Sequence, residues 1–169
     1  GQLLAKKLGI NCYDKEIINL TAKEYGYDTR YIENKEEQSL KASIYYSNDD
    51  KLFESESKVI EDIAKKESCV IIGRCADYVL RKDKHVVKIF LYSDMKSKIN
   101  RSVKYYGLNQ NNAEREITKI NKQRAKHYNH FTGGIWNSLD NYDVAINVDK
   151  FGVENSAEMI KDMILNQNK

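Results

Sequence analysis

The sequence contains no proline, although average usage of about 5% would place roughly eight in a chain of this length. Turns and helix ends must therefore be made by glycine, asparagine and aspartate. No run of 18 apolar residues occurs, which excludes a membrane-spanning helix. The three cysteines are odd in number and lack C-x-x-C spacing. We therefore expect neither a disulfide scaffold nor a structural zinc site, and a reducing cytoplasm is the default compartment.

A phosphate-binding loop of the form G-x-x-x-x-G-K-[ST] is also absent, and Gly133-Gly134 is too little to replace one. None of the three histidines pairs with a serine or cysteine in a recognisable nucleophile context. His127 and His130 are three residues apart on a predicted helix, but no third metal ligand accompanies them. We therefore predict no metal site formed by side chains.

The length and composition of the sequence predict one folded domain over residues 1–169. A chain of this length is the size of a single ordinary domain and too short for two. Hydrophobic residues make up 41%, and twelve tyrosines and four phenylalanines are among them. Such a composition is enough to bury a core, which argues against general disorder.

Short apolar runs alternate with helical periodicities along the chain. Runs at 69–72, 86–91 and 144–148 predict strands, and residues 10–13 form a possible short fourth strand. This alternation favours βαβ units around a parallel sheet, and therefore an α/β fold. The helical patterns cover residues 1–8, 15–23, 49–66, 76–80, 94–106, 113–131 and 154–166.

In a parallel α/β sheet, ligands bind beyond the carboxyl ends of the strands. Arg74 follows a predicted buried strand directly, so its position favours a role in ligand binding. Asp14 follows the possible first strand and is expected to cap the next helix, a role that is compatible with contacting a ligand. The residues just after the three other predicted strands are Gly73-Arg74, Ser93-Asp94 and Asp149.

Positive charge is concentrated in one segment. Residues 96–130 hold nine lysines and arginines against Glu114 and Glu116, a net charge of +7, while the whole chain carries only +3. Such asymmetry suggests an anionic partner near this segment. The alternative, which is the more usual meaning of a charge run, is a solvated helical face.

One arginine of this segment departs from the basic pattern of its helix. Arg124 shares the apolar stripe of residues 113–131, so we expect it to point inward, where it needs a structural carboxylate or a ligand phosphate. Lys98 and Arg101 lie on the flank of the helix at 94–106, where surface charge is the simplest interpretation. The separate basic stripe consists of Arg115, Lys119, Lys122 and Lys126, and the core stripe of the preceding helix of Met95, Ile99, Val103 and Tyr106.

Four segments in order, at 8–17, 70–78, 124–133 and 141–147, make the sequence resemble the cytidylate kinase-like proteins, which are P-loop nucleoside monophosphate kinases. The resemblance implies a three-layer α/β fold with a five-stranded parallel sheet and a mobile lid, here at about 107–135. It also implies transfer of the γ-phosphoryl group of ATP, with magnesium, to a nucleoside monophosphate. Family members begin with a strand and a phosphate loop that are absent before Gly1, and residues 38–48 are short for their region. Either the sequence is truncated or mobile loop residues are missing at these places, and we favour the second alternative.

The sequence also departs from true cytidylate kinases. Their Asp-Gly-Arg-Asp motif is Ile72-Gly73-Arg74-Cys75 here, and their Asp-x-x-Arg lid motif begins with Asn121 and keeps Arg124. Lys15 and Leu20 stand where their substrate helix has a serine and an arginine. Positions that bind phosphate thus persist, whereas those that read cytosine are mostly changed.

By this resemblance the phosphoryl chemistry falls to a few side chains. Arg124 and Arg101, with Lys98 as a weaker candidate, would neutralise the transferred phosphoryl group from the lid side. Arg74 would hold the phosphate of the acceptor, and Asp14 would orient the acceptor or its binding helix. The acceptor base stays open.

Two other functions remain possible. The first is a kinase for another small metabolite, since the base-reading residues have changed. The second is a non-catalytic nucleotide- or RNA-binding module that uses the +7 segment. We expect Tyr105, Tyr106 and Tyr128 to lie on core stripes rather than on a stacking surface, which makes nucleic acid the less favoured partner.

Overall fold

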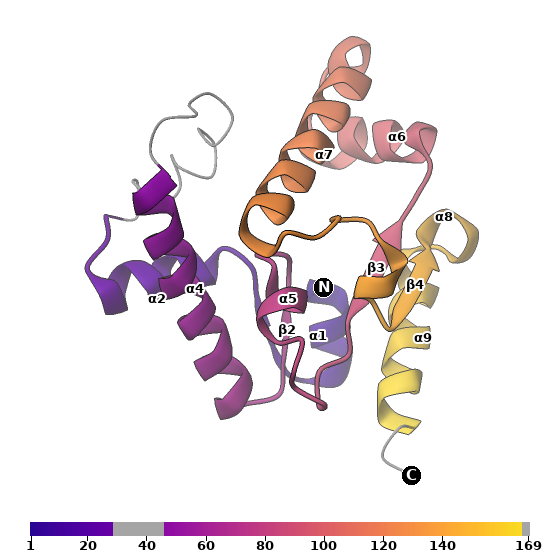
Figure 1. Ribbon diagram of the computed structural model, residues 1–169. Coiled ribbons are helices and arrows are strands. Elements are labelled where there is room, and N and C mark those ends of the chain that lie inside the picture. Colours follow the sequence, from indigo (N-terminus) through magenta and orange to yellow (C-terminus); the bar gives the residue numbers. More distant parts are fainter. Residues whose placement is uncertain (29–45, 167–169) are drawn as a thin grey trace. The chain divides into compact units, whose positions relative to one another are not determined.

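The computed structural model describes residues 1–28 and 46–166, and for residues 46–49 it describes the backbone alone (Figure 1). Every helix and strand that the sequence predicts is present in this part of the chain. The helices are α1 (Gln2–Leu8), α2 (Glu16–Tyr25), α4 (Tyr46–Lys66), α5 (Ala76–Val79), α6 (Met95–Tyr106), α7 (Gln110–Thr132), α8 (Val148–Phe151) and α9 (Val153–Asn166). The strands are β1 (Asn11–Tyr13), β2 (Cys69–Ile71), β3 (Ile89–Tyr92) and β4 (Val144–Asn147), and Leu139–Asn141 form a short 3-10 helix, η1.

Polar residues and glycine set the limits of the two longest helices after β3. The side chains of Asp94 and Asn109 cap α6 and α7 by accepting main-chain N–H groups of their first turns. Gly107 and Gly133 end the same helices in the left-handed conformation, at φ 67° and 68°. The punctuation expected of a proline-free sequence is thereby confirmed at these four positions.

The chain divides into two compact units, residues 1–86 and residues 87–169. In the first unit β1 and β2 pair in parallel, with Cys12 opposite Val70. α1 packs on both strands, and α2 packs on α4. The core between these elements includes Ile17 and Ile60, which are fully buried, together with Val59, Ile63 and Leu80.

In the second unit β3 and β4 pair in parallel, with Phe90 opposite Ala145 and Leu91 opposite Ile146. α6 packs against α7, α8 packs against α9, and α8 also contacts β3. Ala113, Ile117 and Tyr128 are the buried residues of α7. The strand predicted at 86–91 begins later than expected, at Ile89.

The fold class is therefore α/β, mostly helical, with parallel strand pairing as predicted. The described residues form two two-stranded parallel sheets, β1–β2 and β3–β4, in place of the expected single sheet of five strands. Within the same residues no helix is long and apolar enough to cross a membrane. The single domain over residues 1–169 and the lid at 107–135 stay predictions, and the residues expected to be missing near 38–48 fall largely outside the described part.

Candidate functional site

The polypeptide makes a left-handed turn just after β2. Gly73, Arg74 and Cys75 all have positive φ, at 70°, 55° and 53°, and the N–H of Ala76 donates to the carbonyl of Gly73 across 3.0 Å. A non-glycine residue in this conformation costs on the order of 1–2 kcal/mol, and two such residues are adjacent here. Strain of this kind persists only where surrounding contacts hold it, which directs attention to what holds Arg74.

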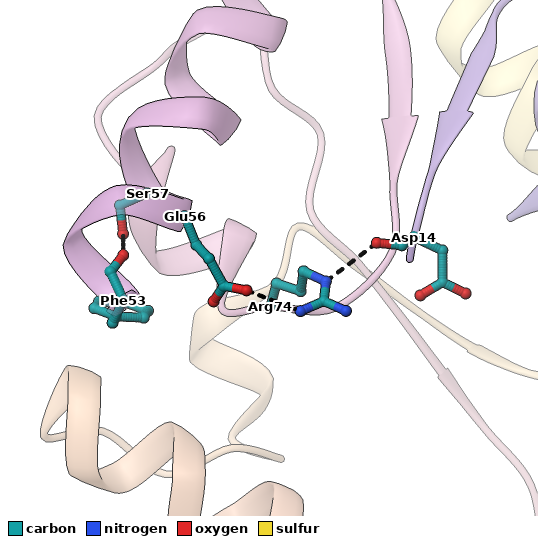
Figure 2. A network of polar contacts seen from close by, with 5 residues as sticks. All are labelled: Asp14, Phe53, Glu56, Ser57 and Arg74. Carbon is teal, nitrogen blue, oxygen red and sulfur yellow. Dashed lines mark hydrogen bonds and ion pairs between the residues drawn. The ribbon is translucent and has the colours of Figure 1, made fainter. Parts of the chain in front are cut away.

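The guanidinium group of Arg74 is held from two sides. Its Nη1 lies 3.1 Å from Oε1 of Glu56 on α4, and its Nε–H donates to the main-chain carbonyl of Asp14 across 3.1 Å (Figure 2). The Arg74 and Glu56 side chains are only 11% and 9% exposed, so this is a buried ion pair. Arg74 thus lies where the sequence predicts, beyond the carboxyl end of β2, with a carboxylate partner that the sequence analysis did not identify.

Asp14 contacts Arg74 through its main-chain carbonyl, and no contact is drawn between its carboxylate and the guanidinium (Figure 2). The prediction that this side chain caps the following helix is wrong, because α2 has Lys15 at its N-cap and no side-chain cap. Instead the carboxylate of Glu16 reaches back to accept the N–H of Asp14 across 2.9 Å. The Asp14 carboxylate makes no hydrogen bond or ion pair with other residues in the described part of the chain, and it remains available to a ligand.

Cys75 completes the turn and is buried. Burial is the main cause that raises the pKa of its thiol to about 12, and the nearby charges of Asp77 and Glu56 add to this. A thiol with such a pKa stays protonated at neutral pH, so it is a poor nucleophile. Cys75 therefore acts as a small apolar residue.

A second polar cluster fixes β1 to the end of α4. The hydroxyl of Tyr13 donates to Oε1 of Glu67 across 2.5 Å, and the amide of Asn11 donates to Oε2 of the same carboxylate across 2.7 Å. The hydrogen bond to Glu67 raises the pKa of Tyr13 to about 12, and the two donors lower the pKa of Glu67. Glu67 lies just before Cys69, at the start of β2, whereas Arg74 follows the end of β2. We therefore assign a structural role to this cluster.

In the second unit Arg124 is exposed, so the expectation that it points inward is wrong. Its Cζ lies 5.9 Å from the centre of the Trp136 ring, within the range of a cation–π interaction. No carboxylate among the described residues forms an ion pair with it. The predicted apolar stripe of α7 is buried at Ala113, Ile117 and Tyr128, but it is exposed in between, at Ile120 and Arg124.

The other two residues predicted on the lid side differ in exposure. Arg101 is exposed, with its Cζ 5.9 Å from the centre of the Tyr105 ring, and Lys98 is half-buried. Tyr105 and Tyr106 are both 66% exposed, so their predicted place on a core stripe is wrong, whereas Tyr128 is buried as expected. All four residues of the predicted basic stripe, Arg115, Lys119, Lys122 and Lys126, are exposed as expected.

The ends of β3 and β4 are joined by acidic and amide side chains. Oδ2 of Asp149 accepts the N–H of Asp94 across 2.6 Å, and Oδ1 of Asn147 accepts the N–H groups of Asp149 and Lys150. The hydrogen bond from the N–H of Ser97 is the main cause that lowers the pKa of Asp94. Both strand-end residues predicted here thus lie together, and both serve to fix the backbone.

The structure brings Asp14 and Arg74 together in the first unit and places Arg124, Arg101 and Lys98 in the second. Their roles toward a ligand stay predictions. Sequence reasoning missed Glu56 and Trp136. Glu56 had a signal, since a charged residue stands on the apolar stripe of α4, four residues after Leu52. Trp136 lies in a loop, where there is no helical or strand periodicity to indicate its position. Within residues 1–28 and 46–166 no group of three or more potential metal ligands gathers.

Comparison with known proteins gives a family and a structural likeness. Residues 1–150 match the cytidylate kinase-like family. A crystal structure of an uncharacterized protein from Eubacterium ventriosum ATCC 27560 matches with a TM-score of 0.71 and 24% sequence identity, over 96% of this chain and 88% of that one. At this identity the likeness supports the fold alone. None of the curated proteins compared with the chain matches it.

Proposed function

Because the chain belongs to the cytidylate kinase-like family, we propose that it is a phosphotransferase that moves the γ-phosphoryl group of ATP to a nucleoside monophosphate. Phosphoryl transfer asks little covalent chemistry of a protein and depends on alignment and on neutralising negative charge. The proposal therefore rests on which cationic and acidic side chains of this chain could contact a phosphorylated ligand.

Arg124 carries the proposal. Its charge is not neutralised by a carboxylate in the described residues, and the Cζ of its exposed guanidinium lies over the Trp136 ring, 5.9 Å from the ring centre. A cation–π contact does not require the N–H groups of the arginine as hydrogen-bond donors, so they can bind a phosphate. We assign to Arg124 the neutralisation of charge on the transferred phosphoryl group, with Arg101 and Lys98 of α6 as supporting cations. The cation–π contact between Arg101 and Tyr105 is compatible with the same use.

The first unit would supply the acceptor site. Glu56 and the carbonyl of Asp14 fix the Arg74 guanidinium, and the strained turn at 73–75 holds the backbone beneath it. We assign the phosphate of the acceptor to Arg74 and the orientation of the acceptor to the unpaired Asp14 carboxylate. Magnesium would enter with ATP as its complex and supply further charge neutralisation, and we assign no side chain of the described residues to it.

The nature of the acceptor base is open to experiment. Cys75 and Ile72 flank the Gly73-Arg74 pair where cytidylate kinases have two carboxylates, so cytosine is not favoured over other bases. The same reasoning admits a small phosphorylated metabolite as acceptor. The cytoplasm, where such nucleotides are abundant and where the three free cysteines would stay reduced, is the compartment we propose.

The test is a panel of acceptors. The protein expressed from its complete gene is given magnesium and ATP with each ribo- and deoxyribonucleoside monophosphate in turn, and release of ADP is measured. We expect release to rise well above the acceptor-free rate for at least one acceptor. A folded protein that no acceptor stimulates would contradict the proposal, and stimulation by a sugar phosphate alone would replace the nucleotide by another metabolite.

One observation favours a second function. Tyr105 and Tyr106 are exposed at the end of α6, and Arg101 and Lys104 both lie within 6 Å of the Tyr105 ring centre, at 5.9 and 5.2 Å. Exposed aromatic rings beside cations suit single-stranded RNA, whose bases stack and whose phosphates pair with the cations. Titration of labelled RNA at two salt concentrations tests this function. Tight, salt-sensitive binding without affinity for ATP would favour the RNA-binding module over the kinase.

A further inference from the structure

The loop that follows α7 holds one aromatic side chain in a defined place. Three successive carbonyls of this loop accept hydrogen bonds from side chains: Gly134 from the Asn129 amide at 3.2 Å, Ile135 from the Asn141 amide at 2.8 Å, and Trp136 from the Tyr142 hydroxyl at 2.8 Å. The loop is thereby tied at one end to α7 and at the other to the segment before β4. Its backbone has little freedom to carry the Trp136 ring elsewhere.

The ring itself rests on the sheet of the second unit. Phe90, on β3, meets the Trp136 ring edge to face, with the ring centres 6.1 Å apart and an interplanar angle of 82°. Phe90 also packs against the ring of Tyr142, with the two ring centres 4.9 Å apart. Aromatic pairs in such arrangements stabilise one another beyond the area they bury. Trp136 is thus part of an aromatic cluster that joins the loop to β3.

On this cluster lies the guanidinium of Arg124, 5.9 Å from the Trp136 ring centre. A carboxylate partner would also fix an arginine, but it would offset part of the charge and occupy some of the N–H donors. The indole ring avoids both effects, because it attracts the cation through its face and leaves the donors in the guanidinium plane unused. The contact orients the side chain and leaves its charge available to an anion.

We propose that Trp136 is a positioning residue that holds Arg124 in the orientation in which it binds the phosphoryl group. The inference rests on the proposed function, since it assumes that Arg124 contacts a phosphorylated ligand. It goes beyond that function by assigning a task to a loop residue that has no charge or proton to contribute. A cation–π contact at an exposed site corresponds to roughly a 2- to 5-fold effect on rate.

Activity measurements on Trp136→Leu and Trp136→Phe give the first test, with Phe151→Leu as the control for loss of an exposed aromatic ring. We expect kcat to fall by roughly 2- to 5-fold in Trp136→Leu, with the KM for the acceptor unchanged, and Trp136→Phe to restore part of the rate. In an Arg124→Ala background, Trp136→Leu should cause no further fall. Additive losses in the double variant would overturn the inference, because they would show that Trp136 acts independently of Arg124.

Fluorescence gives a second test that does not depend on whether the Trp136 variants fold. The sequence contains one tryptophan, so the emission of the protein reports on Trp136 alone. We expect ATP with magnesium and an acceptor to change this emission in the parent protein and not in Arg124→Ala, whose exposed side chain can be removed without loss of the core. An equal change in both proteins, or none in the parent, would overturn the inference.

The two tests separate failure of the inference from failure of the proposed function. A parent protein that transfers no phosphoryl group to any acceptor contradicts the function, and the inference falls with it. A parent protein that is active and depends on Arg124, while Trp136→Leu keeps the parent kcat, leaves the function intact and contradicts the inference alone.

Discussion

The carboxylate of Glu56 and the guanidinium of Arg74 form a buried ion pair, with Oε1 and Nη1 3.1 Å apart. The pair joins α4 to the turn after β2, where Arg74 and Cys75 both adopt positive φ. An arginine in a strained backbone conformation would relax if its side chain were free. Glu56 therefore stabilises a backbone conformation as well as a charge.

Removing Glu56 should destabilise the protein strongly. Glu56→Ala leaves the Arg74 charge without this buried partner, a change that typically costs about 3–5 kcal/mol in the free energy of unfolding. Glu54→Ala, at an exposed position of the same helix, serves as the matched control and should change stability by about 0.5 kcal/mol or less. Urea denaturation followed by circular dichroism measures both, and equal effects of the two substitutions would show that the pair contributes no net stability.

Asp14→Asn separates a ligand role from a structural one. The carboxylate has no partner in the described residues, and the contact with Arg74 uses the main-chain carbonyl, which the substitution retains. Stability should therefore stay within about 0.5 kcal/mol of the parent protein. Loss of one charged hydrogen bond to the acceptor should lower kcat/KM for the acceptor by about 10- to 100-fold. Earlier melting with unchanged kcat/KM would show that Asp14 is structural.

Arg124→Lys tests the assignment of the phosphoryl-binding arginine. Lysine keeps the charge but lacks the planar fork that grips two oxygens and stacks on an indole ring. We expect kcat to fall by about 10²–10³ with little change in the melting temperature, since the side chain is exposed. Arg115→Lys, on the exposed basic stripe of the same helix, should keep the parent rate. Similar rates for both variants would remove Arg124 from the assigned role.

Tyr13→Phe should change how stability depends on pH. The raised pKa of Tyr13 contributes stability that is complete below its ordinary value of 10 and is lost as the pH rises through about 12. The lowered pKa of Glu67 contributes stability above its ordinary value of 4.5 that is lost as the pH falls through the folded-state value. We expect the variant to be less stable at neutral pH and to lose less stability than the parent at both extremes. Parallel stability–pH curves for the two proteins would contradict this coupling.

The secondary structure of this chain could be predicted because its signals are local. The run Cys69–Ile72 is apolar throughout and ends at a glycine, and Asp94 and Gly107 are standard limits for the helix between them. Parallel pairing followed from the alternation of strands and helices and is confirmed by the register of both pairs. The number of strands in one sheet depends on contacts between distant segments, for which the sequence has no comparable signal.

A charged residue on an apolar helical stripe indicates a buried ion pair, but we applied this signal to Arg124 and not to Glu56. Arg124 is exposed, whereas Glu56 is buried. The difference lies in the surroundings, because α4 packs on both α2 and α5, whereas the stripe of α7 is uncovered at Ile120 and Arg124, between the buried residues Ile117 and Tyr128. Helical periodicity shows which residues share a face, and tertiary packing decides how far along the helix that face stays covered.

The same limit explains the two tyrosines at the end of α6. Tyr106 continues the spacing of Met95, Ile99 and Val103, but the helix ends at Tyr106 and nothing in the described residues covers that last turn. Tyrosine tolerates this position because its ring can lie along the surface with its hydroxyl in water. The position of a residue within its helix therefore matters as much as its spacing.

The most direct measurement of the central claim follows the phosphate itself. ATP labelled at the γ-phosphate is mixed with magnesium, a nucleoside monophosphate and the protein expressed from its complete gene, and the labelled products are separated. The account predicts label in a nucleoside diphosphate, formed only when acceptor is present and about 10²–10³ times more slowly by Arg124→Lys. Label that stays in ATP, or appears only as inorganic phosphate whether or not acceptor is present, would contradict it.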